Sequence, residues 1–428
     1  MIEFLTSLFS DHPKVLILGF GKEGKSTYGF IRKHFPNLKL GIADSNIEIE
    51  NDEGLSNDGN LELFTGSSYL ESLNQFDIII KSPGVNISNV TSKFTGVITS
   101  QTDLFLRYYS NQVIGVTGTK GKSTTVSLIK HFLDATNVDS LLLGNIGVPA
   151  FDMIEAIKSD TVIVYELSAH QLEYLMKSPH VAVLLNIFPE HLDYFKTYND
   201  YQIAKLNICK FQEKDNCLIV NDSLANKLPH RRQRIIVIPN GDTKLEIDNI
   251  PLAGEHNLIN IEAALAAVEE VGIDRAVAIK SLANFRGLPH RLEDIGMFGG
   301  IRFVNDSIST IPESTIAAIK AIKNIDTLLL GGWDRGLDYS ELVDFLLTSK
   351  VSNFIFLGKA GDRMYDIFNA NNDKNLFKVD SLANAFEIII KQTKKGSICL
   401  LSPAAASYDQ FHNFEHRGDT FRSLASKL

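Results

Sequence analysis

Two copies of one local pattern, a short apolar run followed by a glycine loop and a helix-like segment, most constrain how this chain can fold. They read LGFGKEGKST at residues 18–27 and GVTGTKGKSTT at residues 115–125. Backbone N–H groups at the start of a helix attract anions, so either loop could hold nucleotide phosphates. Only the first meets the strict phosphate-loop spacing, because Val116 stands where the second would need its leading glycine.

The first window is typical of the nucleotide-binding turn of a Rossmann-like fold. Gly19, Gly21 and Gly24 are spaced as Gly-x-Gly-x-x-Gly, and Asp44 ends a later apolar run. That run ends at roughly the 20-residue offset expected of a ribose-binding acid. The motif is weakly specific, since a tight turn with no ligand has the same spacing. An NAD-dependent dehydrogenase would also explain this window and stays an alternative.

The second window is the better candidate for ATP because of the residues that follow it. A phosphate-loop enzyme needs a lysine on the β and γ phosphates, a hydroxyl on Mg²⁺ and an acid that shares the metal. Lys122, Ser123 and Glu166, which ends the apolar run TVIVYE, supply these groups. His191 follows the run VAVLLNI, where α/β proteins place ligand-contacting residues. Taken alone, it is better explained as an ordinary surface or core histidine.

Short apolar runs alternate with helix-like segments along all 428 residues, which predicts an α/β fold with mainly parallel sheets. This length fits three domains, for which we predict the limits 1–100, 101–287 and 288–428. The net charge of −9 argues against nucleic acid as a partner. No signal peptide or membrane-spanning run is recognisable, so we expect a cytoplasmic protein with no membrane partner. Its three cysteines are expected to be free thiols.

A set of segments along essentially the whole chain resembles the Mur ligase family. No single motif decides the resemblance, but the ordered set is highly specific. The family's phosphate loop has the form Thr-Gly-x-x-Gly-Lys-Ser/Thr, so Val116 is no defect in the second window. The segments are GVTGTKGKSTT, LLGNIGVP, YELSAHQLE, NIFPEHLDYF, YQIAKLNI, AGEHNLINIEAALAA, FRGLPHRLE, VNDSIST and LLSPAAASYDQFHNFEHRG.

The resemblance implies an N-terminal Rossmann-like domain for the UDP end of the substrate, a central P-loop-type ATPase domain and a C-terminal Rossmann-like domain for the amino acid. It implies an ATP-dependent amide ligase of peptidoglycan precursor synthesis. Such an enzyme adds D-glutamate to UDP-N-acetylmuramoyl-L-alanine through an acyl phosphate. We expect a monomer. Folylpolyglutamate synthase, which lacks the N-terminal domain, and a non-enzymatic ATP-binding protein would explain less of the chain.

The resemblance also assigns residues to each part of the site. The expected catalytic residues are Lys122, His191, Lys205 and Asp306. ATP is expected at Gly118, Thr119, Gly121, Lys122, Ser123, Thr124, Asn257, Arg291 and Asp306. The UDP-substrate is expected at Gly19, Phe20, Gly21, Lys22, Asp44, Ser45 and Asn145. Two Mg²⁺ ions are expected at Ser123, Glu166, His191 and Lys205. Lys205 would act as a carbamate, because the addition of CO₂ turns its amine into a carboxylate.

In the third domain the resemblance assigns the glutamate to Thr310, Arg335, Ser407 and Phe414. Arg335 stands where the family carries a lysine, and an arginine can bind a carboxylate through two hydrogen bonds. Residues 306–311 read DSISTI where the family usually has DSKATN, so Ile308 removes a cation from the amino-acid site. This departure keeps L-glutamate open as an alternative substrate. In the UDP site, Asn46 likewise replaces a family arginine.

Overall fold

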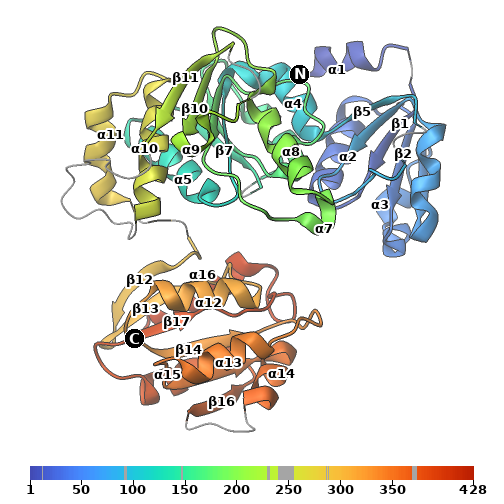
Figure 1. Cartoon of the computed structure of the whole chain (residues 1–428). Helices are drawn as coiled ribbons and strands as arrows, with labels where there is room; N and C mark the ends of the chain where they lie inside the picture. The colour runs from blue at the N-terminus through green and yellow to red at the C-terminus, as the bar shows by residue number, and fades with distance from the viewer. Residues whose placement is uncertain are drawn as a thin grey trace. The chain divides into compact units, whose positions relative to one another are not determined.

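The chain folds into two compact units, Met1–Phe285 and Arg286–Leu428, seen here in a computed structural model (Figure 1). The structure describes residues 1–11, 13–90, 94–145, 148–228, 232–239, 255–285, 287, 289–368 and 374–428. Three β-sheets organise these residues, two in the first unit and one in the second. Each unit is described below by itself.

The first sheet has the strand order β3-β2-β1-β4-β5, and all its neighbouring strands are parallel. Its central strand is buried at every position, as expected for a parallel strand covered on both faces. The strands are β1 (Val15–Leu18), β2 (Leu40–Asp44), β3 (Leu61–Thr65), β4 (Ile78–Lys81) and β5 (Val97–Thr99). The helices are α1 (Ile2–Leu8), α2 (Lys22–His34), α3 (Glu53–Ser56) and α4 (Gln101–Tyr109).

The second sheet has the order β11-β10-β9-β6-β8-β7 and is also parallel throughout. Its strands are β6 (Val113–Thr117), β7 (Ser140–Gly144), β8 (Val162–Glu166), β9 (Val181–Leu184), β10 (Cys217–Asn221) and β11 (Arg234–Ile238). Its helices are α5 (Lys122–Ala135), α6 (Ala169–Leu172), α7 (Leu192–Phe195), α8 (Tyr198–Lys210), α9 (Asp222–Ala225), α10 (Glu255–Glu269) and α11 (Arg275–Ser281). Short 3₁₀ helices in this unit are η1 (Ile47–Asn51), η2 (Gly66–Gln75), η4 (Ser110–Gln112), η5 (Ala150–Ala156) and η6 (Leu282–Asn284).

One apolar core joins the first two sheets. It runs from Val15 of β1 through Phe105 of α4 to Tyr165 of β8 and Tyr201 of α8. The rings of Phe105 and Tyr165 meet edge to face with their centroids 5.7 Å apart. A second core lies on the other face of the second sheet, between the strands and helices α5 and α10. The shared core explains why both sheets belong to one compact unit.

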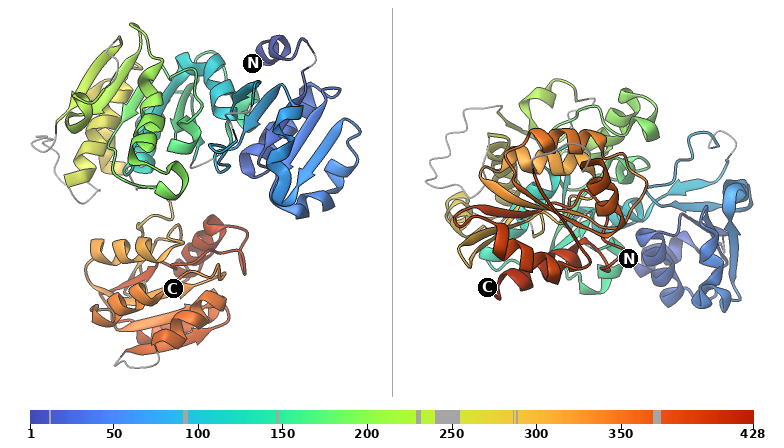
Figure 2. Two further views of the ribbon diagram at one scale, coloured as in Figure 1. Left: turned by 45° about the vertical axis from the view of Figure 1, so that its right-hand side comes forward. Right: turned by 90° about the horizontal axis from the view of Figure 1, so that it is seen from below.

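The third sheet has the order β12-β13-β17-β14-β15-β16, with β12 antiparallel to β13 and the other pairs parallel. Helices lie on both faces and bury separate cores (Figure 2). The strands are β12 (Glu293–Phe298), β13 (Ile301–Asn305), β14 (Ile325–Gly331), β15 (Asn353–Leu357), β16 (Asn375–Val379) and β17 (Ile398–Leu401). The helices are α12 (Pro312–Ala321), α13 (Ser340–Thr348), α14 (Gly358–Phe368), α15 (Leu382–Gln392) and α16 (Phe414–Ala425).

These sheets confirm the α/β class and the mainly parallel pairing predicted from the sequence. The predicted limits of three domains stay a prediction. Among the described residues, no helix has the length and apolar character that crossing a bilayer requires.

The first glycine loop packs against its own helix through Gly24. A Cβ atom added at Gly24 would lie 2.1 Å from the carbonyl oxygen of Gly19, far inside van der Waals contact. Gly29, in the same helix, is exposed and has open space around the equivalent position. The two glycines therefore form a matched pair, one needed for close packing and one not.

We predict that Gly24→Ala lowers the free energy of unfolding by about 1–3 kcal/mol, because the loop and α2 must move apart. Gly29→Ala should be neutral or stabilise by up to about 1 kcal/mol, since alanine is the better helix former. Urea unfolding followed by circular dichroism measures both changes. Equal midpoints for the two variants would contradict the packing role of Gly24.

Candidate active site

The second glycine loop connects β6 to α5 and is held by Asn186, which follows β9. Thr119 N–H donates to the backbone carbonyl of Asn186 at 2.9 Å, and Lys120 N–H donates to its side-chain oxygen at 2.8 Å. The amide of Asn186 donates back to the carbonyl of Lys120 at 2.9 Å. Gly121 has a φ of +89°, a left-handed conformation that favours glycine. The loop is thus fixed before α5 begins at Lys122.

Helix α10 lies beside this loop. A Cβ atom at Gly121 would lie 2.4 Å from Oδ1 of Asn260, so a side chain there would displace the amide of Asn260. Asn260 in turn donates to Oδ1 of Asn257, the residue expected at the adenine, at 3.0 Å. The structure therefore brings Asn257 to the side of the glycine loop.

The expected phosphate contacts differ in exposure. Thr119 is 5% exposed, and its hydroxyl accepts from Phe188 N–H at 2.9 Å and lies 3.0 Å from the Tyr201 hydroxyl. This hydroxyl is committed to holding the loop. Ser123 is buried in the first turn of α5, next to the partly buried Thr124. A helix of this length with a glycine loop at its start is a suitable phosphate site.

Two lysine amines converge on one carbonyl oxygen of the loop. Lys122 Nζ donates to the carbonyl of Gly118 at 2.9 Å, and Lys205 Nζ of α8 donates to the same oxygen at 2.8 Å. Lys205 is 2% exposed. Burial lowers the pKa of its ammonium to about 7, and the charge of Lys122 acts in the same direction. The amine of Lys205 can therefore be neutral near physiological pH.

Glu166 is the last residue of β8, so it lies at the end of a strand as the sequence predicted. Its side chain is fully buried. Its Oε1 accepts from the side-chain amide of Asn145 at 2.8 Å, which brings together two expected site residues. Its Oε2 accepts no hydrogen bond from the described residues. An unpartnered carboxylate oxygen in the interior is costly, and a cation would offset that cost. This environment fits a divalent metal ion.

His191 lies at the start of α7 and is half exposed, with its ring 6.1 Å from that of Tyr201. Its backbone is left-handed, with a φ of +56°. Among the described residues, no group of three or more His, Cys, Asp or Glu side chains could hold a metal ion. These four residue types alone therefore do not complete a metal site around Glu166 in the part of the chain that the structure describes.

At the first glycine loop, Asp44 organises the backbone. Its Oδ2 accepts from Phe20 N–H at 2.6 Å and its Oδ1 from Asn46 N–H at 2.8 Å. Gly19 has a φ of +88°, and its carbonyl accepts from the Ser82 hydroxyl at 2.7 Å. The remaining expected residues adjoin this turn: Gly21 caps α2, Lys22 begins it, and Ser45 is exposed.

In the second unit, the loops after β13, β14 and β17 meet at the carboxyl edge of the sheet. Asp306 is 2% exposed and accepts from the Ser402 hydroxyl at 2.7 Å. Burial raises the pKa of this carboxyl group. Arg335 donates to the carbonyl of Thr310 at 2.7 Å, which brings together two residues expected at the glutamate. Arg291, expected at ATP, lies on the exposed side of this edge.

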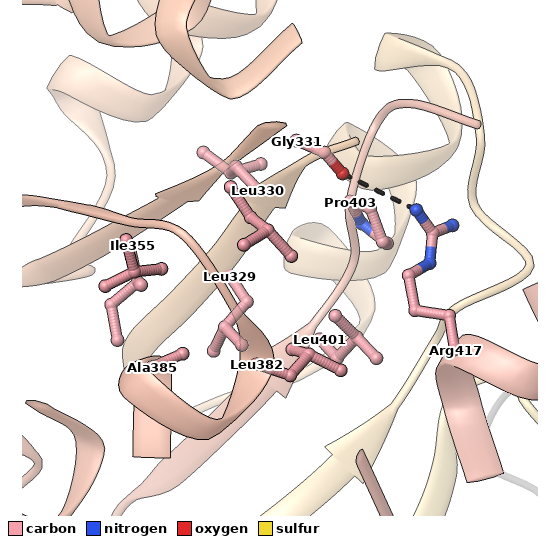
Figure 3. A pocket seen from close by; sticks show the side chains of 11 residues that line it. Leu329, Leu330, Gly331, Ile355, Leu382, Ala385, Leu401, Pro403 and Arg417 are labelled. Carbon is pink, nitrogen blue, oxygen red and sulfur yellow. Dashed lines mark hydrogen bonds between the residues drawn. The ribbon is translucent and has the colours of Figure 1, made fainter. Parts of the chain in front are cut away.

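Arg417 of α16 connects these loops, and the sequence analysis did not single it out. Arg417 is 1% exposed, and its guanidinium donates to the Ser307 carbonyl at 2.8 Å and to the Ala405 carbonyl at 3.0 Å. It also donates to the Gly331 carbonyl at 3.5 Å (Figure 3). Burial lowers its pKa to about 10. The apolar cavity beside it, of about 10 Å³, has room for one water at most. Arg417 is therefore a support for the loops.

The other two residues expected at the glutamate adjoin this support. Ser407 is buried in the loop after β17, and Phe414 begins α16. The hydroxyl of Ser307 donates to the carbonyl of Phe414 at 2.8 Å. The structure thus gathers Thr310, Arg335, Ser407 and Phe414 around the loops that Arg417 holds.

Comparison with known proteins identifies relatives of the whole chain. Residues 116–246 match the family model described as Mur ligase middle domain, and residues 13–96 match that of the Mur ligase MurD-like N-terminal domain. The UDP-N-acetylmuramoylalanine–D-glutamate ligase of Clostridium botulinum (strain Kyoto / Type A2) is 30% identical over 457 aligned positions, covering 98% of each chain. The enzyme of the same name from Clostridium kluyveri is 31% identical over 452 positions, covering 97% of each.

Solved structures share the fold at lower identity. MurF of Acinetobacter baumannii superposes with a TM-score of 0.59 at 17% identity, covering 92% of this chain and 88% of its own. The UDP-N-acetylmuramate–alanine ligase MurC of Thermotoga maritima gives 0.56 at 18% identity, with 97% and 100% covered. At such identities these structures support the fold alone.

Proposed function

Because this chain belongs to the Mur ligase family, we propose that it joins D-glutamate to UDP-N-acetylmuramoyl-L-alanine at the expense of ATP. The observation that carries the proposal is the identity of 30–31% along nearly the full length to enzymes named for that reaction. The chain is an ATP-dependent amide ligase, and the dehydrogenase alternative would explain only the first glycine loop.

The loop between β6 and α5 is the proposed ATP site. Its backbone is fixed by Asn186, and the N-terminus of α5 offers N–H donors to the phosphates. Lys122 already points back over the loop, where its ammonium donates to the carbonyls of Gly118 and Thr119. When phosphate binds, this ammonium would exchange a carbonyl partner for a phosphate oxygen.

The chemistry then follows from charge. The alanyl carboxylate oxygen attacks the γ-phosphorus and ADP leaves; the glutamate amine then attacks the acyl carbon, and phosphate leaves after the amine has lost its proton. Both reactants of the first step are anions, so positive groups must lower their repulsion. Mg²⁺ would supply part of that charge, with Ser123, Glu166, His191 and a carbamate on Lys205 as its proposed ligands. Asn145 holds Glu166 for this task through its 2.8 Å hydrogen bond.

The loops of the second unit are the proposed glutamate site. The guanidinium of Arg335 can bind a carboxylate through two hydrogen bonds once it releases the carbonyl of Thr310. Arg417 keeps the flanking loops in place from beneath. The substrates of this reaction are cytoplasmic, so we propose the cytoplasm as its location, with a monomer as the expected state.

One observation favours a second candidate substrate, L-glutamate. Ile308 is partly buried and Ile311 is 41% exposed, in the stretch that the family fills with a lysine and an asparagine. A site that loses a cation must fix the glutamate carboxylates with fewer charges. The handedness of the amino acid is therefore the sharpest test of the proposed function.

We expect phosphate release from ATP and UDP-N-acetylmuramoyl-L-alanine to depend on D-glutamate, with the amide product identified by mass spectrometry. Turnover with L-glutamate should be lower by a factor of about ten or more, because one carboxylate of L-glutamate would miss its contact in the site. Lys122→Met, which removes the phosphate lysine, is the negative control. Turnover with L-glutamate but not with D-glutamate would make L-glutamate the substrate. No turnover with either amino acid would refute the ligase function.

We also propose that Lys205 carries CO₂ as a carbamate. Its buried amine has a lowered pKa of about 7. The site also contains Glu166, whose Oε2 accepts no hydrogen bond from the described residues. In the carbamate, the amine nitrogen bonds to the carbon of CO₂ and loses a proton to solvent. The product is an anion that would replace the neutral buried amine beside the ammonium of Lys122.

CO₂ adds only to a neutral amine, so carbamylation should increase as the pH rises through about 7. We expect ¹³C NMR of the protein in ¹³C-bicarbonate to give a carbamate signal at pH 8 that weakens at pH 6. Lys205→Arg should abolish this signal. Lys210→Arg, at an exposed position of the same helix, should leave it intact. A signal that survives in Lys205→Arg would disprove the modification.

A further inference from the structure

The side chain of Gln171 joins the first turn of α2 to the segment that follows β8. Gln171 lies in α6, directly after the strand that ends at Glu166, and is 3% exposed. Its side-chain oxygen accepts from Ser168 N–H at 2.9 Å and caps α6. Its side-chain amide donates to Oε1 of Glu23 at 2.7 Å. Glu23 belongs to the first turn of α2, two residues after Gly21 of the first glycine loop.

The side chain of Glu23 has only one of its two carboxylate oxygens hydrogen-bonded among the described residues. Its Oε2 is buried and accepts no hydrogen bond from the described residues, and burial raises the pKa of its carboxyl group. The charge of Lys81 acts on it in the opposite direction. Lys81, at the end of β4, is 2% exposed and lies 3.5 Å from Glu173, which follows α6. A buried lysine is thus set between carboxylates from both sides of the boundary between the two sheets.

Other contacts keep the same helix turn in place. The amide of Gln101 in α4 donates to the backbone carbonyl of Glu23 at 3.2 Å and to the Thr27 hydroxyl at 3.0 Å. Its oxygen accepts from Ala150 N–H at 3.1 Å. These bonds anchor the backbone of α2. Only the bond from Gln171 reaches from the Glu23 side chain to the loop that follows Glu166, among the contacts of the described residues.

We propose that Gln171 and Glu23 are positioning residues, which fix the UDP-binding loop relative to the acid at the end of β8. The inference rests on the proposed function, because it requires one substrate to span both regions. The UDP group would bind at the first glycine loop, and the alanyl carboxylate must then arrive beside the ATP site. A shift of about 1 Å between two such regions can cost roughly a hundredfold in rate.

The test exchanges the two side chains. Gln171→Glu keeps the cap on Ser168 but sets two carboxylates against each other with no donor between them. Glu23→Gln keeps an acceptor for Gln171 and removes only the charge. In the double variant, the new amide at position 23 can donate to the new carboxylate at position 171, so the bond is restored in the reverse direction.

We expect Gln171→Glu to raise KM for UDP-N-acetylmuramoyl-L-alanine about tenfold or more, as the loss of one buried hydrogen bond allows. KM for ATP should stay within about twofold, because the loop at Gly118 is held separately by Asn186. Glu23→Gln and the double variant should stay within about threefold of the wild type for both substrates. If Gln171→Glu does not fold, Glu23→Ala replaces it, with the same increase expected.

Gln112→Glu is the matched control. Gln112 donates to the carbonyls of Lys158 at 2.7 Å and Thr161 at 2.9 Å, at the amino end of β6, remote from the carboxyl ends of the strands. The same substitution there should lower the melting temperature without changing either KM. An equal rise in both KM values for Gln171→Glu, an unchanged KM, or a double variant no better than Gln171→Glu would overturn the inference.

Calorimetric titration with UDP-N-acetylmuramoyl-L-alanine separates this inference from the proposed function. A wild type that binds this compound but releases no phosphate would refute the ligase reaction, and the weakened binding expected in Gln171→Glu could still be measured. A wild type that binds and ligates, with every variant unchanged, would refute the positioning role alone.

Discussion

The convergence of two lysine amines on the carbonyl oxygen of Gly118 is the interaction on which the first unit's site depends. One carbonyl accepts from both amines, and burial lowers the pKa of the Lys205 ammonium to about 7. Its position fixes α8 against the loop, and Tyr201 of the same helix holds Thr119. A phosphate or a metal ion entering there would meet groups already aligned, so little reorganisation is needed at the moment of reaction.

The parallel sheets supply the second constraint. Since every strand of the first two sheets runs the same way within its sheet, the glycine loops and the acids that follow strands collect at carboxyl edges. The shared core around Phe105 and Tyr165 then holds those edges together in one unit. Polar groups at this boundary are costly to bury, and each has a partner: Lys81 pairs with Glu173, and the carboxylate of Glu23 accepts from Gln171 and is further stabilised by the charge of Lys81.

Those parts of the fold and of the candidate site that depend on a local sequence pattern could be predicted from the sequence. The apolar run, the glycines and the following helix identified both loops, and strand-end position identified Glu166. Asn186 also follows a strand, but the sequence pattern favoured His191 as the residue after that strand. The hairpin between β12 and β13 also had a local signal, Gly299–Gly300, both of which take positive φ values. It was missed because the parallel strands dominate the pattern.

The remaining residues could not be found in this way. Arg417 gains its role only because the carbonyls of Ser307 and Gly331, both far away in the chain, meet that of Ala405 around its guanidinium. Gln171 and Glu23 are separated by 148 positions and meet only across the two sheets. The hydroxyl of Thr119 is likewise held by tertiary contacts, with Phe188 and Tyr201, while its contact with ATP stays a prediction. Local spacing holds no information about such pairs.

The central claim is that the alanyl carboxylate becomes an acyl phosphate, and oxygen transfer tests it most directly. UDP-N-acetylmuramoyl-L-alanine labelled with ¹⁸O in its carboxylate is incubated with ATP and D-glutamate, and the released phosphate is examined by mass spectrometry. The account predicts one ¹⁸O atom in each phosphate, because the oxygen that attacks the γ-phosphorus leaves with it. Unlabelled phosphate accompanying amide formation would contradict the account.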